Sequence, residues 1–206
     1  ELMNDRSTVI SMNVDVTNLS NALDCIEQLA IKQAGSYVCI SNVHMCMEVF
    51  DSSEFESVVN NADLVIPDGR PISWAQKLLS HSEAEQVRGQ DIMHAVCQQS
   101  GINGLNIGLY GGSTDELLQR VVTELQTSYP GINITFSYSP PFRPLTDEED
   151  QGIIHKINDA DVNVLFVGIG CPKQERWMAV HKESLNCVML GVGAAYDFIA
   201  GSKKHA

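Results

Sequence analysis

Short, almost continuously apolar segments alternate with helical patterns along this 206-residue chain. Segments 64–66 (LVI) and 162–170 (VNVLFVGIG) are apolar at successive positions, as expected for strands that are buried on both faces. Stretches such as 19–30 repeat apolar residues at helical spacing instead. Strands of this kind belong to mostly parallel sheets that helices cover on both faces. The sequence therefore predicts an α/β fold of that architecture.

Local signals predict several element boundaries. One strand is expected over residues 7–14 (STVISMNV), and a helix over 90–101 is expected to stop at Gly101. Three S/T-x-x-E patterns predict capping boxes, in which a hydroxyl and a carboxylate satisfy backbone N–H groups at a helix start. The three pairs are Ser53 with Glu56, Ser113 with Glu116, and Thr146 with Glu149.

Length and charge restrict the class of protein. We expect residues 1–206 to form a single core, with halves 1–101 and 102–206 that meet near Gly101. The net charge of −13 disfavours nucleic acid as a partner. No apolar run approaches the roughly 18 residues of a membrane span, and the first ten residues do not resemble a signal peptide. None of the six cysteines is in C-x-x-C spacing, which favours reduced thiols in a cytoplasmic protein.

Ligands of parallel α/β sheets bind at the carboxyl ends of the strands. Asp68 lies at such an end, in the sequence Pro-Asp-Gly. This tripeptide is also common turn chemistry, so a structural role and a functional role are both open for Asp68. The other polar or glycine-rich corners at this edge are Asn42, Gly111-Gly112, Gly170–Pro172 and Gly191–Gly193.

Two of these corners suit a phosphate. The turn at Gly111-Gly112 precedes a helix whose first N–H groups favour an anion, although glycine-rich turns often serve packing alone. A nicotinamide dinucleotide site would also need an acidic residue about 20 positions later, and the strand that ends FSYSPP has none. Lys173 and Gln174 follow the next corner, where they are either solvated helix residues or ligands of a phosphate or sugar.

The residues do not predict a metal site. Asp159 and Asp161 imitate the D-x-D motif of many nucleotide-sugar enzymes, but they precede a strand and so lie at the opposite edge of the sheet. The six histidines have no metal-ligand spacing. We therefore expect Asp159 and Asp161 to belong to a solvated turn.

The ordered corners resemble the WecG/TagA/CpsF family of bacterial glycosyltransferases. The resemblance runs from about Val9 to the last residue and rests on Asn42 and on five segments. These are ADLVIPDG (62–69), RGQD (88–91), YGG (110–112), FVGIGCPKQE (166–175) and GVGAAYDFIAG (191–201). Many members have Thr two residues before the Asn, where this chain has Ile40, with Ser41 beside it. Arg70 and Pro71 also replace small residues that usually follow P-D-G.

The resemblance implies a Rossmann-like, inverting enzyme that needs no metal or other cofactor. It would move a sugar, most often of the N-acetylmannosamine type, from a UDP donor to a polyprenyl-diphosphate-linked sugar at the cytoplasmic membrane face. The resemblance also implies a role in the synthesis of a cell-surface polysaccharide, with teichoic-acid linkage, enterobacterial antigen, capsule and exopolysaccharide all open. The family's proposed base corresponds to Asp68, and the other implied site positions are Asn42, Arg88, Gln174 and Asp197. Gly69, Gly111, Gly112, Lys173 and Gly193 complete the predicted substrate site.

In this interpretation the half 1–101 carries the base and the acceptor, and the half 102–206 carries the nucleotide. Two alternatives stay open from the residues alone: a non-catalytic nucleotide-binding module and an NAD(P)-dependent enzyme. The particular sugar, the acceptor, the pathway and the oligomeric state also stay open. Family members usually continue into a basic helical segment that reaches the membrane. Because this chain has only Lys203 and Lys204 there, we expect it to be a core without that segment.

Overall fold

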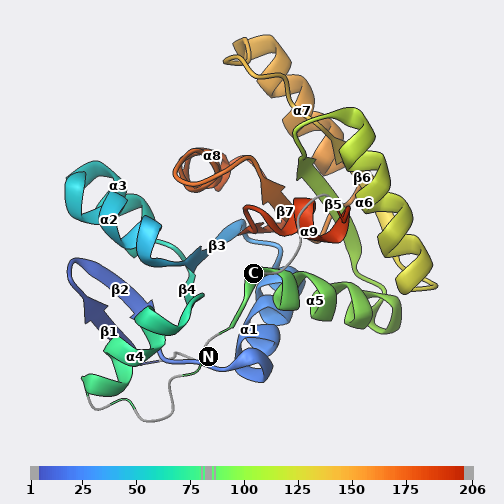
Figure 1. Cartoon of the computed structure of the whole chain (residues 1–206). Helices are drawn as coiled ribbons and strands as arrows, with labels where there is room; N and C mark the ends of the chain where they lie inside the picture. The colour runs from blue at the N-terminus through green and yellow to red at the C-terminus, as the bar shows by residue number, and fades with distance from the viewer. Residues whose placement is uncertain (1–4, 80, 82–84, 86, 202–206) are drawn as a thin grey trace.

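The computed structural model describes residues 5–79, 81, 85 and 87–201. Its centre is a six-stranded sheet in the order β4-β3-β8-β7-β5-β6, and each neighbouring pair is parallel (Figure 1). The prediction of a parallel, Rossmann-like α/β sheet is confirmed. The strands are β3 (Ser36–Ser41), β4 (Leu64–Pro67), β5 (Asn106–Gly111), β6 (Asn133–Tyr138), β7 (Val164–Gly168) and β8 (Val188–Gly191).

Helices cover both faces of this sheet. The helices are α1 (Leu19–Lys32), α2 (Val43–Asp51), α3 (Ser53–Asn60), α4 (Arg70–Leu78), α5 (Gly89–Asn103), α6 (Asp115–Ser128), α7 (Asp147–Asp159), α8 (Lys173–His181) and α9 (Ala195–Ile199). Successive strand residues point to opposite faces. Val38 and Ile40 therefore pack in one core with α1, α5, α6 and α9, whereas Tyr37 and Cys39 pack in another with α2, α3, α4, α7 and α8.

The predicted single strand over residues 7–14 is wrong. Two antiparallel strands, β1 (Arg6–Val9) and β2 (Met12–Asp15), form a separate hairpin, with Val9 paired to Met12. The chain reverses at Ile10, whose φ is +59°. Two-residue hairpin turns favour such backbone angles, usually at Gly, Asn or Asp. The apolar Ile10 therefore hid the turn in the sequence.

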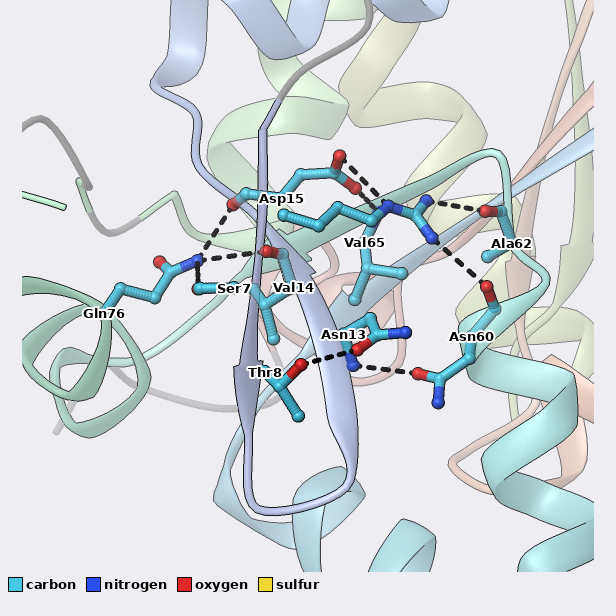
Figure 2. Close-up of polar contacts among 10 residues, drawn as sticks. Ser7, Thr8, Asn13, Val14, Asp15, Asn60, Ala62, Val65 and Gln76 are labelled. Atoms are coloured by element: carbon cyan, nitrogen blue, oxygen red, sulfur yellow. Dashed lines mark hydrogen bonds and ion pairs between the residues drawn. The ribbon is translucent and has the colours of Figure 1, made fainter. Parts of the chain in front are cut away.

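Polar side chains attach this hairpin to the main body (Figure 2). Gln76 of α4 is fully buried, and its Nε2 donates to the Ser7 hydroxyl at 3.0 Å and to the backbone oxygens of Val14 and Asp15. Arg6 of β1 donates to the backbone oxygen of Ala62 at 2.8 Å. These contacts join α4 and the segment just before β4 to the hairpin.

Two helix starts differ from the predictions by one residue. The hydroxyl of Ser52, not of Ser53, accepts from the backbone of α3, and Thr114, not Ser113, caps α6. The capping box of Thr146 and Glu149 is confirmed. Adjacent hydroxyls are equivalent in the sequence pattern, and only the extended backbone angles of the true cap select one.

Helix α5 continues beyond its predicted stop at Gly101. It ends instead at Gly104, whose φ of +71° is the left-handed conformation that commonly terminates a helix. The sheet itself is continuous between the two halves, because β8 lies between β3 and β7 and pairs with both. Among the helices of the described residues, none has the length and apolar character needed to cross a bilayer.

Candidate active site

Two adjoining cavities open at the carboxyl edge of the sheet. The first cavity, of ≈ 510 Å³, is lined by residues that follow β3, β4 and β8 and by the starts of α5 and α8. The second cavity, of ≈ 430 Å³, lies between the starts of α6, α8 and α9 and the turn 140–142. Gly170, Gly193 and Ala194 line both cavities and form their common wall.

Eight of the ten predicted site residues line these cavities. Asn42, Asp68, Arg88 and Gln174 line the first, Gly112, Lys173 and Asp197 line the second, and Gly193 lines both. Gly69 and Gly111 line neither. The edge of the sheet therefore brings together residues that lie up to 155 positions apart in the chain, from Asn42 to Asp197.

Asp68 directly follows β4 and is held at both its backbone and its side chain. Its N–H donates to the Ser41 oxygen at 2.6 Å, and its Oδ2 accepts from the N–H of Gly89 at 3.2 Å. Gly89 is the first residue of α5, so the carboxylate faces the positive end of a helix. The side chain is half-buried. Burial raises the pKa of Asp68, while the Gly89 N–H and the Arg88 charge counteract part of this rise.

Arg88 directly precedes Gly89, whose N–H donates to Asp68. The Arg88 side chain forms an ion pair with Asp91. Its Nε lies 2.8 Å from Asp91 Oδ2, and a second nitrogen lies 3.2 Å from Oδ1. Both side chains are substantially exposed, and such surface pairs contribute only about 0.2–1 kcal/mol. A bound diphosphate can therefore compete with Asp91 for Arg88.

Asn42 has a structural bond as well as a place in the first cavity. Its Oδ1 accepts from the Met45 N–H at 2.9 Å and caps α2. The amide nitrogen is therefore the side-chain atom that can donate to a ligand. Ile40 lines the same cavity. The neighbouring Ser41 is buried, and its hydroxyl donates to the Ile66 oxygen at 2.9 Å. The Ser41 hydroxyl therefore belongs to the sheet, not to the cavity.

Gln174 is 3% exposed and connects the two loops of the common wall. Its Oε1 accepts from the N–H of Gly193 at 3.2 Å, and its Nε2 donates to Glu175 at 3.3 Å. A Cβ at Gly191 would approach this amide to 3.3 Å, so the glycine leaves the room that the amide occupies. The amide oxygen of Gln174 therefore holds the Gly193 loop in place through this hydrogen bond.

The second cavity combines charged side chains with an apolar wall. Lys173 is exposed at the start of α8, and Asp197 is half-buried in α9. Pro140, Pro141 and Phe142 also line this cavity, and Phe142 is 86% exposed. An apolar surface in the same cavity as a cation is suited to a base and a phosphate of one nucleotide.

The two glycines outside the cavities have conformational or packing reasons of their own. Gly69 has a φ of +104°, which L side chains rarely adopt. A Cβ at Gly111 would overlap the Gly168 carbonyl and the Tyr196 ring. Tyr196 is buried there, and its hydroxyl donates to the Phe166 oxygen at 2.6 Å. Gly111 thus lets α9 pack against β5 and β7.

With this geometry in place, comparison with known proteins identifies the family. The sequence pattern of the Glycosyl transferase WecG/TagA/CpsF family matches residues 7–206. The chain belongs to this family. It is therefore a glycosyltransferase, and the non-catalytic module and the NAD(P)-dependent enzyme are not needed as explanations.

Curated relatives of this glycosyltransferase include proteins of Staphylococcus aureus strains COL and MW2. Both are named N-acetylglucosaminyldiphosphoundecaprenol N-acetyl-beta-D-mannosaminyltransferase. Each is 25% identical to this chain over 201 residues, which is 96% of this chain and 77% of the relative. The similarity therefore extends across both cavities and includes every predicted site residue within its span.

Sequence reasoning missed Glu175 of this glycosyltransferase. It stands among the charged residues at the start of α8, but its exposure is 0%. Burial raises the pKa of the Glu175 carboxyl to about 7, against smaller opposing effects of the Cys171 thiol and the Gln174 amide. The only signal was its place in the segment CPKQE next to Gln174. Gly89 and the turn 140–142 were also missed, because neither carries a charged side chain.

The D-x-D sequence of the glycosyltransferase lies away from both cavities. Asp159 ends α7, pairs with exposed His155 at 2.9 Å, and does not line either cavity. Asp161 follows in the turn that leads into β7. Within the described ranges, His, Cys, Asp and Glu side chains form no group of three that could hold a metal ion.

Proposed function

We propose that this glycosyltransferase moves an N-acetylmannosamine-type sugar from a UDP donor to a polyprenyl-diphosphate-linked sugar, with inversion at the anomeric carbon. The relatives' printed names support this donor sugar and this class of acceptor. The observation that carries the proposal is the carboxylate of Asp68 in the first cavity, fixed by the Gly89 N–H at 3.2 Å. Its place beside a second cavity suited to a nucleotide supports transfer between two substrates.

Asp68 is the proposed general base. It takes the proton of the acceptor hydroxyl while that oxygen forms a bond to the anomeric carbon. The bond from this carbon to the β-phosphate oxygen breaks on the opposite side, and UDP leaves with the bonding electrons. A rigid carboxylate suits this task, and its burial keeps the pKa above that of an ordinary aspartate, which strengthens it as a base.

The departing UDP gathers negative charge that the chain itself must stabilise. Lys173 and the N-terminus of the nine-residue helix α8 lie at the second cavity, and Arg88 lies at the first. The start of α6 is a weaker candidate, because Asp115 and Glu116 already occupy its first turn. We propose that these groups act without a metal ion, with Asp197 and the wall 140–142 holding the nucleoside.

The acceptor's lipid implies work at the inner face of the cell membrane, and we propose that the enzyme is peripheral there. Lys203 and Lys204, on which the expectation of a missing basic segment rests, lie outside the described residues. A homo-oligomer is an additional open proposal. A longer natural form, if one exists, should sediment with anionic vesicles more strongly than this chain, at about 1 kcal/mol for each added cation. Equal sedimentation would contradict the role of such a segment.

The test of the function is a screen of labelled UDP-sugars against a short-chain lipid-diphosphate acceptor that carries N-acetylglucosamine. We expect label to appear in the acceptor with a UDP-linked N-acetylmannosamine donor, and the product anomer to be inverted. Transfer from none of the donors, despite UDP binding, would reject the proposal. Retention of the anomeric configuration would reject the single-base mechanism.

A further inference from the structure

Glu175 combines complete burial with incomplete hydrogen bonding. It lies in the first turn of α8 and has no exposed surface. One carboxyl oxygen, Oε1, accepts from Gln174 Nε2 at 3.3 Å, and the Cys171 thiol is a further hydrogen-bonding neighbour of the carboxyl. The other, Oε2, is buried and makes no hydrogen bond within the part of the chain that the structure describes. The side chain is close to the first cavity, whose wall includes its neighbours Cys171 and Gln174.

Such a carboxyl does not stabilise the core. Burying a polar oxygen without a partner is unfavourable, and buried charged groups can often be replaced by apolar residues of similar volume without loss of stability. A methionine or leucine at position 175 would lie on α8 one turn before Met178, which belongs to the apolar core on that face of the sheet. A purely structural role for Glu175 is therefore a poor explanation of its chemistry.

The carboxyl does control the orientation of its neighbour. The amide of Gln174 can rotate by half a turn, which exchanges its oxygen and nitrogen at little steric cost. Only when Nε2 faces Glu175 does Oε1 face the N–H of Gly193, from which it accepts at 3.2 Å. The opposite orientation would set an NH₂ group against that N–H, and it would set two oxygens against each other while Glu175 is ionised. The Gly193 N–H and the ionised carboxyl of Glu175 thus favour the same orientation of the amide.

The orientation of the Gln174 amide affects both cavities through Gly193. It lies in the loop between β8 and α9, and it lines the first and the second cavity. A shift of this loop would change the position of one substrate relative to the other. Displacements of about 1 Å can reduce a reaction rate by about 100-fold.

We propose that Glu175 is a positioning residue, which orients the Gln174 amide and so fixes the Gly193 loop between the two cavities. Its effect on catalysis rests on the proposed function, whereas its effect on the loop does not. This role predicts that replacement of Glu175 by an apolar residue separates stability from activity. It also predicts that the effect passes through Gln174.

The experiment compares Glu175→Met, Glu175→Gln and a matched control, Gln76→Met. Gln76 is also a buried polar residue, and its side-chain oxygen has no hydrogen-bond partner among the described residues, but it holds the β1–β2 hairpin and lines neither cavity. We expect Glu175→Met to unfold at the wild-type temperature or higher, yet to lose about 10- to 100-fold in kcat. Glu175→Gln, whose amide oxygen can still accept from Gln174, should recover most of the rate. Gln76→Met should lose stability and keep its kcat.

Amide hydrogen exchange at Gly193 tests the role without any transfer assay. We expect faster exchange at Gly193 in Glu175→Met and in Gln174→Ala, with wild-type exchange in Gln76→Met. In the double variant Glu175→Met with Gln174→Ala, the Glu175 change should have no additional effect on exchange or kcat. Wild-type exchange at Gly193, additive effects, or parallel loss of stability and rate in Glu175→Met would each overturn the proposal. If wild-type enzyme transfers no sugar, the proposed function fails, and the exchange data still decide the role of Glu175.

Discussion

The two cavities differ in the kind of group that they present to a substrate. The first holds Asp68, a carboxylate that is half-buried, fixed by a backbone N–H and raised in pKa. The second holds Asp197 and Lys173 beside an apolar wall, which suits recognition of a nucleotide more than proton transfer. We propose that this edge of the sheet separates proton transfer from the binding of the leaving group, with the Gly193 loop lining both cavities.

The largest expected effect comes from a substitution that changes the chemistry of the first cavity alone. Asp68→Asn keeps the size of the side chain and an oxygen that can accept from Gly89, but it removes the base. We expect the rate of sugar transfer to fall by about 10²–10⁴-fold, the usual contribution of a positioned base. Initial rates with saturating donor and acceptor measure this change. A variant that keeps most of its turnover would leave Asp68 as a turn residue only.

The next effect concerns the buried carboxyl of Glu175, which bonds to Gln174 in the first cavity. Since the folded-state pKa of Glu175 is raised from 4.5 to about 7, the folded protein binds this proton more tightly than the unfolded chain. Between these pH values the group therefore makes the free energy of unfolding fall as the pH rises, in total by about 3 kcal/mol.

Glu175→Gln removes this titration. Urea unfolding at several pH values should show the variant gaining stability relative to wild type as the pH rises from 4.5 to 7, with no further relative change above that range. A constant difference across the series would mean that Glu175 is ionised as readily as in the unfolded chain. Asp68 would then be the only one of these two carboxyls whose pKa is raised in the folded protein.

A smaller effect should appear at the edge of the first cavity. Asp91 raises the pKa of Asp68 and also engages Arg88 at 2.8 Å. Asp91→Asn removes the negative charge and releases Arg88, so both changes favour the ionised form of Asp68. The base must be ionised to act, and we therefore expect the acidic limb of kcat/KM to move to lower pH. An unchanged limb would show that another group limits the rate in acid.

The last prediction is that removal of metal ions leaves the rate of sugar transfer unchanged. Transfer should survive EDTA, because Lys173, Arg88 and the start of α8 are proposed to stabilise the diphosphate. The measurement is the initial rate after dialysis against EDTA, with and without added Mg²⁺ or Mn²⁺. Loss of activity that these ions restore would give the second cavity a metal and weaken the contrast between the two sites.

The sequence contained most of the fold and much of the site. Apolar strands specified the parallel sheet, and the rule that ligands bind at carboxyl strand ends placed Asp68 and Gln174 correctly at cavities. The sequence did not predict the hairpin because Ile10 occupies a turn position where a glycine or asparagine would have indicated a turn. It did not predict the burial of Glu175 for a different reason. Three charged residues open α8, at 173, 175 and 176, and only tertiary packing decides which of them is buried.

The most direct test of the account is the dissociation constant of UDP in two matched variants, Asp68→Asn and Asp197→Asn. Each replaces one carboxylate by an amide of the same size, the first in the chemical cavity and the second in the nucleotide cavity. Isothermal titration with UDP should give Asp68→Asn the wild-type affinity. It should give Asp197→Asn a loss of about 10-fold or more, as expected for a charge-assisted hydrogen bond. Weakened UDP binding in Asp68→Asn with unchanged binding in Asp197→Asn would contradict the division of functions between the two cavities.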